Sequence, residues 1–349
     1  MKRALSAVGL TAVSALTAAG CSSSSAATHG GNSSPQVVLR LGFQTNITHA
    51  PALIGIEKGF FAKALGKNVK LVLKPFSTGT EEGTALLAGQ LDAAYVGPNP
   101  TLKAWQTSNG KLIKVISGAA SGGAALVVKM GITTPAQLKG QKLATPSLGN
   151  TQDVALRYWL KLHHLTTTQT GGGDVPITPI TPNSAAVLQF KSGQIAGGWE
   201  PAPYDIEMVQ DGGHMLVNEA SLWPSGQFVT TNLVVTDKFL AAHPSVVNGL
   251  LKGQIKANDY IHSNTSGAEA AANAELTKLL GSGLDPSVLS AAFSQVTFTD
   301  NPIASSLATD AQHAVSVGLL SPVKSLPSLY DLGPLNALLK AAGQQQVSP

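Results

Sequence analysis

The chain has 349 residues, a formal net charge of +4 at pH 7 and a single cysteine. One cysteine excludes an internal disulfide, a zinc–cysteine cluster and an iron–sulfur centre, and the small charge excludes the strongly basic surface of a nucleic-acid-binding protein. Hydrophobic residues make up 43% of the chain, so it can bury a core that needs neither a disulfide nor a metal.

The first 21 residues have the layout of a secretory signal. Basic residues at Lys2–Arg3 precede the stretch 4–19, which consists of small or apolar, uncharged residues. The stretch is shorter than the about 20 apolar residues that a membrane-spanning helix needs. The stretch resembles a bacterial lipoprotein signal, which implies lipidation at Cys21, although Ala18 stands where that family usually has leucine. The alternative is an ordinary secretory signal with a chance cysteine. The polar, serine-rich residues 22–36 predict a flexible tether.

After the tether, strand-like and helix-like segments alternate, which predicts a mostly parallel α/β sheet. The first group of expected strands is 37–42, 69–76, 92–96 and 113–117, with helices at 51–65, at 79–90 and from Pro98 onward. The second group of expected strands is 124–128, 141–146, 175–180, 195–199 and 215–218, with helices at 134–138, 151–162, 184–191 and 201–210. Strand 175–180 is expected at a sheet edge, because Pro176 and Pro179 cannot donate to a ladder.

The character of the chain changes after a last extended stretch at 227–235. The remainder predicts helices with little strand, at 237–242, 244–263, 267–280, 285–293, 302–317 and 333–342. Such a helical tail is expected to pack back onto the first α/β unit. The chain would then cross between two lobes near 121–125 and near 230–232, which creates a hinge and an interlobe cleft. The expected division is lobe 1 at 37–123 and 232–349, and lobe 2 at 124–231.

Ligands of open α/β sheets bind beyond the carboxyl ends of the strands. The loops at those positions are rich in neutral polar residues, glycine and proline, and several begin helices, where free N–H groups favour an anion. The candidate ligand-binding residues are Gln44, Asn46, Ser77, Gly97, Asn99, Ser121, Gly122, Asn150, Thr151, Gln152, Trp199 and Glu200. None is lysine or arginine, so an anion would be held by dipoles. Taken singly, Gly97 could be only a turn and Asn150 only a helix cap.

Several longer stretches resemble the solute-binding proteins of ABC importers for nitrate, sulfonates and taurine, over about residues 38–265. The stretches are 51–61, 88–97, 148–157, 193–201 and 222–228. The resemblance implies a two-lobed α/β fold of the periplasmic-binding-protein type (type II) that closes on its solute. It also implies an exported protein, lipid-anchored on the outer face of the membrane, that delivers a small anion to a permease with its ATPase. We expect a monomer without a cofactor or a metal.

The expected solute is a sulfonate-type anion, an aliphatic sulfonate or taurine. A taurine-like zwitterion would place its sulfonate at the helix N-termini and its ammonium group at Glu200, with Trp199 over the spacer. The alternative is that Glu200 points away or caps a helix, and that Trp199 belongs to the core.

The same fold could instead bind nitrate, bicarbonate or a thiamine- or pyrimidine-type precursor. Ring compounds need aromatic walls, for which the loops offer only Phe43, Phe76, Trp199 and Trp223. A sensor domain that passes the solute to a receptor is a further alternative.

An enzyme is not expected, because His49, Asp153 and Glu200 form no recognisable nucleophile–base motif. The adjacent His163 and His164 would point about 100° apart on a helix, which does not favour a metal site.

Overall fold

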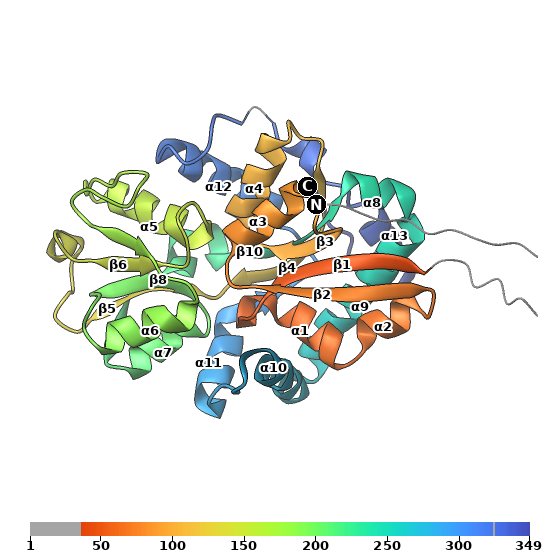
Figure 1. The fold of residues 1–349 in the computed structure, drawn as a ribbon, viewed down its shortest axis with the longest axis horizontal. Coiled ribbons are helices and arrows are strands. Elements are labelled where there is room, and N and C mark those ends of the chain that lie inside the picture. Colours follow the sequence, from red (N-terminus) through yellow and green to blue (C-terminus); the bar gives the residue numbers. More distant parts are fainter. Residues whose placement is uncertain (1–35, 324) are drawn as a thin grey trace, which may run out of the picture. The chain divides into compact units, whose positions relative to one another are not determined.

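The computed structural model describes residues 36–323 and 325–349. The expected signal, Cys21 and nearly all of the tether lie outside these residues. The described part contains two β-sheets with helices packed against them (Figure 1). None of its helices is long and apolar enough to cross a membrane.

The first sheet has six strands in the order β11-β4-β10-β3-β1-β2. Its strands are β1 (Val37–Gln44), β2 (Val69–Phe76), β3 (Ala93–Val96), β4 (Ile113–Gly122), β10 (Val229–Thr236) and β11 (Val296–Phe298). β1 pairs in parallel with β2 and β3, whereas β10 is antiparallel to β3 and β4, and β11 is antiparallel to β4. The sheet is therefore mixed rather than mostly parallel, because β10 enters it from the second sheet in the opposite direction.

The second sheet has five strands in the order β7-β6-β8-β5-β9. They are β5 (Ala124–Lys129), β6 (Leu143–Thr145), β7 (Ile177–Pro179), β8 (Gly197–Pro201) and β9 (Gly213–Asn218). β7 lies at the edge, which confirms the expectation from its prolines. This sheet is also mixed, since β6 is parallel to β7 and β8 but β5 is antiparallel to β8 and β9.

The helices between the strands follow the predicted pattern, with differences at glycine and proline. They are α1 (Ala50–Glu57), α2 (Phe60–Leu65), α3 (Gly79–Leu87), α4 (Pro98–Thr107), α5 (Thr151–Leu162), α6 (Asn183–Lys191) and α7 (Tyr204–Gln210). The single helix expected at 51–65 is split, because Gly59 adopts a left-handed conformation with φ of 66°. The helix expected at 201–210 begins only at Tyr204. Ala202 precedes Pro203, and a residue before a proline disfavours the helical conformation. Residues 135–138 form a single 3-10 turn.

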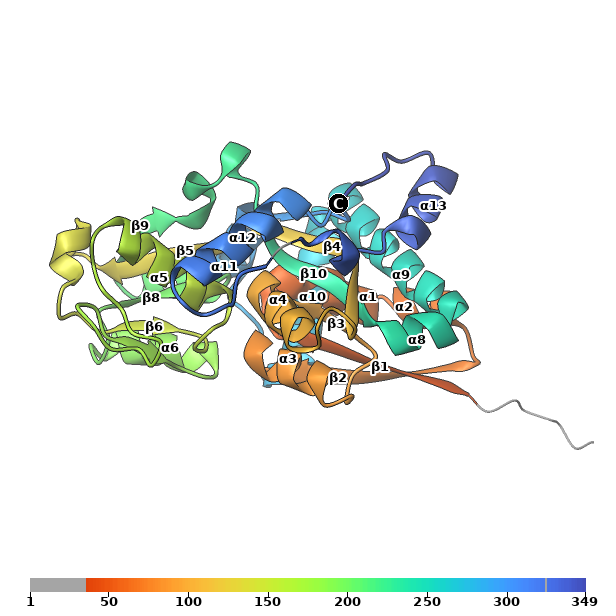
Figure 2. The ribbon, with the colours of Figure 1, turned by 90° about the horizontal axis from the view of Figure 1, so that it is seen from above.

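The C-terminal part is helical, as the sequence predicts, apart from the short strand β11. Its helices are α8 (Asp237–Ala242), α9 (Pro244–Ser263), α10 (Thr265–Leu280), α11 (Pro286–Gln295), α12 (Ala304–Ser316) and α13 (Gly333–Ala341). Leu250 of α9 and Ala272 of α10 share a buried core with Leu39 of β1 and Leu53 of α1. α12 instead lies beside α5 (Figure 2). There the His313 ring stacks on Tyr158 with 3.6 Å between ring centroids.

The chain passes between the two sheets twice. β4 ends at Gly122 and β5 begins at Ala124, within the first crossing expected near 121–125. The return runs through residues 219–228, upstream of the expected position, because β10 already pairs with β4 from Val229, opposite Ser121. Residues 229–231, expected in lobe 2, are therefore strand residues of the first sheet. Below, lobe 1 denotes the part built on the first sheet and lobe 2 the part built on the second.

Candidate functional site

A small cavity lies where loops of lobe 1 meet loops of lobe 2. Its volume, taken as the space open to the centre of a water-sized sphere, is about 20 Å³. The lining residues are Gln44, Asn46, Thr48, His49, Gly79, Gly97, Pro100, Pro146, Asn150, Thr151, Gln152, Pro201 and Thr230. None of them is lysine or arginine, and none is phenylalanine, tyrosine or tryptophan. A space of this size holds a water molecule or a compact ionic group.

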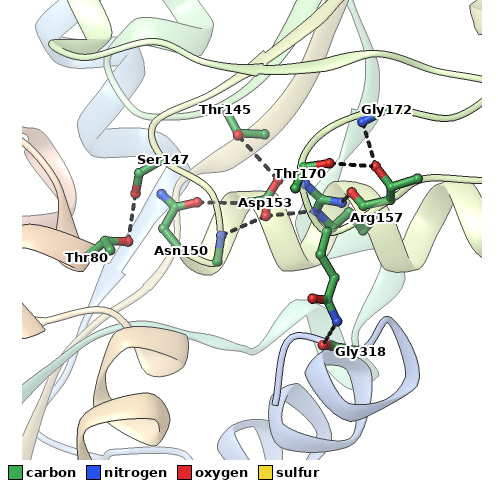
Figure 3. Close-up of polar contacts among 12 residues, drawn as sticks. Thr80, Thr145, Ser147, Asn150, Asp153, Arg157, Thr170, Gly172 and Gly318 are labelled. Carbon is green, nitrogen blue, oxygen red and sulfur yellow. Dashed lines mark hydrogen bonds and ion pairs between the residues drawn. The ribbon is translucent and has the colours of Figure 1, made fainter.

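The lobes are closed around this cavity. The Ile47 N–H donates to the Ala202 carbonyl at 3.0 Å, and the Tyr204 hydroxyl donates to the Thr45 carbonyl at 3.2 Å. The hydroxyls of Thr80 and Ser147 lie 2.8 Å apart (Figure 3). Each of these contacts joins a residue of lobe 1 to a residue of lobe 2.

Three helices begin at the cavity. Thr78 caps α3 by accepting from the Glu81 N–H, and Asn150 caps α5 by accepting from the Asp153 N–H at 2.9 Å. Gly97 precedes α4, which has proline at its first position. The first N–H groups of a helix lack intrahelical partners, and the helix dipole adds positive potential there. The cavity is therefore suited to a small anion, although it contains no cationic side chain.

The turn after β1 supplies further neutral groups. The Asn46 side-chain oxygen accepts from the Thr48 N–H at 3.0 Å and from the Thr48 hydroxyl at 2.8 Å. The Gln44 N–H donates to His49 Nδ1 at 3.2 Å. Burial lowers the pKa of His49 to about 3, so the ring is neutral at neutral pH. Because Nδ1 accepts, the ring hydrogen is on Nε2, and His49 contributes dipoles rather than charge.

A buried ion pair holds the start of α5 in place. Asp153 Oδ2 accepts from the Arg157 Nε at 2.8 Å and from the Gly149 N–H at 2.7 Å (Figure 3). The Asp153 side chain is 0% exposed and the Arg157 side chain 1% exposed. Arg157 also donates to the Thr168 carbonyl. The pair thus ties α5 to the loop that carries Asn150 into the cavity.

We expect Arg157→Met to lower the free energy of unfolding by about 3–5 kcal/mol, because it leaves Asp153 buried without its counter-ion. Urea denaturation followed by circular dichroism measures this change. The matched control is Lys191→Met, which breaks the pair between Lys191 and Asp211, where Lys191 is 64% exposed; exposed pairs contribute at most about 1 kcal/mol. Equal losses in the two variants would contradict a structural role for the buried pair.

The structure brings part of the predicted site together. The predicted residues that line the cavity are Gln44, Asn46, Gly97, Asn150, Thr151 and Gln152. Ser77 lines a neighbouring space of about 380 Å³, which shares Asn46 with the cavity, and Asn99 lines a groove of about 700 Å³. Ser121 and Gly122 lie at the first crossing, where the Ser121 hydroxyl accepts from the Phe228 N–H and the Gly122 carbonyl accepts from the Thr230 hydroxyl.

Trp199 and Glu200 are not among the residues that line the cavity, and they lie on opposite faces of β8, as neighbours in a strand do. Trp199 is fully buried and donates to Glu219 at 2.7 Å. Both carboxyl oxygens of Glu200 are buried without a partner among the described residues. Burial, with a smaller contribution from Asp205, raises the pKa of Glu200 well above its usual value. The role of Glu200 as the partner of an ammonium group stays a prediction.

The cavity is also lined by residues that are not among the candidates from the sequence, namely Thr48, His49, Gly79, Pro100, Pro146, Pro201 and Thr230. The sequence suggests His49 only as a catalytic candidate, although it continues the same polar turn as Asn46. Thr230 belongs to β10, and only the return of the chain from lobe 2 brings it to this place.

Comparison with known proteins connects this geometry to a family. Residues 32–277 match the model of the NMT1-like family. The taurine-binding periplasmic protein of Escherichia coli is 26% identical over 227 residues, which cover 63% of this chain and 65% of that protein. The bicarbonate transport ATP-binding protein CmpC of Synechocystis is 26% identical over 245 residues, covering 64% of this chain and 35% of that protein. The chain thus spans less than two thirds of the length of either relative.

Solved structures show the same fold at lower identity. The alkanesulfonate-binding protein SsuA of Xanthomonas axonopodis, bound to MOPS, has a TM-score of 0.68 and 19% identity over 84% of this chain and 97% of that chain. The periplasmic nitrate-binding protein NrtA of Synechocystis has a TM-score of 0.71 and 14% identity over 88% of this chain and 89% of that chain. These similarities confirm the resemblance found in the sequence. The chain belongs to the NMT1-like family and has the α/β fold of periplasmic binding proteins.

Proposed function

We propose that this protein is the extracytoplasmic solute-binding component of an ABC importer. It captures a small sulfonate-type anion, an aliphatic sulfonate or taurine, and delivers it to a permease with its ATPase. In this proposal the protein is a monomer without catalytic activity, exported by its N-terminal signal and anchored to the membrane through a lipid on Cys21. The observation that carries the proposal is the closed interlobe cavity at the start of α3, α4 and α5, whose described lining residues are all neutral.

The charge of the cavity supports an anionic solute. Backbone N–H groups at helix starts and the hydroxyl and amide groups of Thr151, Asn150 and Gln152 are donors. None of the described residues that line the cavity carries a carboxylate that would repel an anion. The similar proteins are named as binding taurine, alkanesulfonate and nitrate, and all of these are small solutes with an anionic group.

Nitrate or bicarbonate is the second candidate, and the cavity volume of about 20 Å³ favours it. A thiamine- or pyrimidine-type ring is disfavoured, because it is too large for a cavity of this volume. In addition, the part of the chain that the structure describes places no phenylalanine, tyrosine or tryptophan in the cavity lining on which such a ring could stack.

Titration calorimetry on the protein without residues 1–21 tests the proposal. The panel contains nitrate, bicarbonate, sulfate, ethanesulfonate, taurine and a pyrimidine precursor. We expect binding of ethanesulfonate, and its loss by about tenfold in Thr151→Ala, which removes one neutral donor. The control is Thr309→Ala, on α12 and away from the cavity, which should leave affinity unchanged.

The pattern of binding separates the alternatives. Tighter binding of taurine than of ethanesulfonate, lost in Glu200→Gln, would place the ammonium group at Glu200. Binding of nitrate alone would replace the sulfonate with an inorganic anion. Binding of only the ring compound would contradict the proposed anion.

A further inference from the structure

A buried acid lies behind one of the residues that line the cavity. Gln44, at the end of β1, lines the cavity, and its Nε2 donates to Glu82 Oε2 at 3.1 Å. Glu82 belongs to the first turn of α3 and is 0% exposed, and it is not itself among the residues that line the cavity. Gln44 therefore links the carboxyl group of Glu82 to the space proposed for the solute.

The missing side chain of Gly42 makes room for this carboxyl group. Gly42 and Gln44 are two residues apart in β1, so both positions are on the same face of the sheet. A Cβ at Gly42 would lie 2.8 Å from Glu82 Oε1, which is buried without a hydrogen-bond partner among the described residues. Because these three residues all belong to lobe 1, the burial of Glu82 does not depend on closure of the lobes.

Among the described residues, no cationic side chain forms an ion pair with this carboxyl group. The elements packed against α3 are β1, β2, β3 and α4. Arg40 of β1 pairs with Asp92 at 2.7 Å, and the Tyr95 hydroxyl of β3 donates to Gln254 at 2.6 Å. The other charged side chains of these elements and of α3 are exposed, namely Lys70, Lys74, Glu81 and Lys103.

The folded protein therefore favours the uncharged form of Glu82. Burial raises the pKa of Glu82 well above its usual value, and the hydrogen bond from Gln44 opposes this with a smaller effect. His49, which accepts from the Gln44 backbone N–H, is neutral as well, because burial lowers its pKa to about 3. An uncharged acid accepts the hydrogen bond from Gln44 without placing a negative charge beside the cavity.

We propose that Glu82 is a positioning residue for the anion and that it acts through Gln44. The uncharged acid accepts one N–H of Gln44 Nε2 and leaves the second to the solute, because Nε2 has no other partner among the described residues. Nε2 lies beside the cavity, since a Cβ at Gly79, which lines it, would be 3.3 Å away. Ionised Glu82 would repel the anion.

Capture of the anion is thereby coupled to a proton on Glu82. This inference rests on the proposed function and adds to it a regulation of the same site by pH. Affinity is full where Glu82 is protonated in the free protein, and it falls as pH rises and the free protein loses that proton, because the bound anion favours the protonated acid.

Calorimetry with ethanesulfonate tests this coupling, because a sulfonate stays ionised throughout the neutral and alkaline range. We expect the affinity of the wild type to fall roughly tenfold between about pH 6 and about pH 9. At the higher pH, binding should take up protons, so buffers with different ionisation enthalpies should give different heats of binding.

Glu82→Gln has nearly the same shape but does not ionise. It should bind ethanesulfonate as the wild type does at the lower pH, and it should lose both the pH dependence and the proton uptake. The matched control is Glu81→Gln, which changes the neighbouring exposed acid of α3 and should behave as the wild type at both pH values.

A double-mutant cycle at the lower pH tests whether Glu82 acts through Gln44. Glu82→Leu removes the acceptor of the amide, and we expect roughly tenfold weaker binding. Gln44→Met removes the amide itself, so Glu82→Leu should have no further effect in that background. A structural role of Glu82 would instead give additive losses, which would overturn the inference.

The outcomes separate this inference from the proposed function. If neither ethanesulfonate nor an inorganic anion binds at either pH, the proposed function is wrong and the inference fails with it. If ethanesulfonate binds without proton uptake, or if the uptake persists in Glu82→Gln, only the inference is overturned. The measurement on the wild type needs no variant, so the inference can be contradicted even if Glu82→Leu does not fold.

Discussion

Gly97→Ala is expected to weaken solute binding by about 10- to 100-fold without unfolding the protein. A Cβ at this position would lie 2.5 Å from Thr151 Oγ1 of the opposite lobe. Either the lobes stay apart or the Thr151 hydroxyl turns out of the cavity, and both outcomes remove donors from the bound anion. Calorimetry measures the affinity. X-ray scattering shows whether ligand still reduces the radius of gyration, as closure of a hinged protein does.

A double-mutant cycle with Thr151→Ala identifies the clash as the cause. If the hydroxyl is what the new methyl group meets, the double variant binds as Thr151→Ala alone does, and the two effects are not additive. Gly131→Ala is the matched control, because a Cβ there meets nothing within 4 Å. Additive losses in the cycle would contradict this account of closure.

The protein is expected to lose stability as pH rises from about 6.5 to 8.5. Burial raises the pKa of Asp205 and of Glu219 to about 7, and the pKa of Glu200 and Glu82 well above the usual value. The folded state keeps protons that the unfolded state releases near pH 4. The contribution of these groups is therefore full at low pH and is lost as pH rises through the folded pKa.

The buried histidines change stability with pH in the opposite direction, and they do so over a lower pH range. Burial lowers the pKa of His49 to about 3 and of His313 to about 4, so stability is lost as pH falls below about 6.5, where the unfolded histidine takes up a proton. Above that pH both states hold neutral histidine, and the acids alone set the slope. Thermal unfolding should show Tm falling by several degrees between the two pH values.

Glu200→Gln tests whether a buried carboxyl group, rather than a general effect of alkaline pH, causes the loss of stability. The amide has nearly the same shape and does not ionise, so we expect Tm to rise relative to wild type near pH 8.5 and to change little near pH 5.5. Glu81→Gln, at an exposed position of α3, is the control and should leave the slope unchanged. A wild-type slope in Glu200→Gln would mean that folded Glu200 is already ionised over this range, as it is in the unfolded state.

Much of the fold follows from local patterns. α5 has the predicted bounds, since Asn150 is a good cap and Leu156 and Leu160 recur at helical spacing on a buried face. The loops after β1 and β3 reach the cavity, because the ends of parallel strands meet at one sheet edge. The direction of β10 could not be predicted, since it depends on where the chain returns from lobe 2.

The amino-acid sequence alone was sufficient to identify the family, the alternation of strands and helices, and the neutral loops suited to an anion. These features depend on residues close together in the chain. Tertiary structure was needed to show that Thr230 reaches the cavity, that Asn99 lines the neighbouring groove and that Glu200 lies outside the cavity lining. Side-chain direction at such positions depends on helix rotation and on lobe closure. Both are set by contacts between distant segments, such as the approach of Gly97 to Thr151.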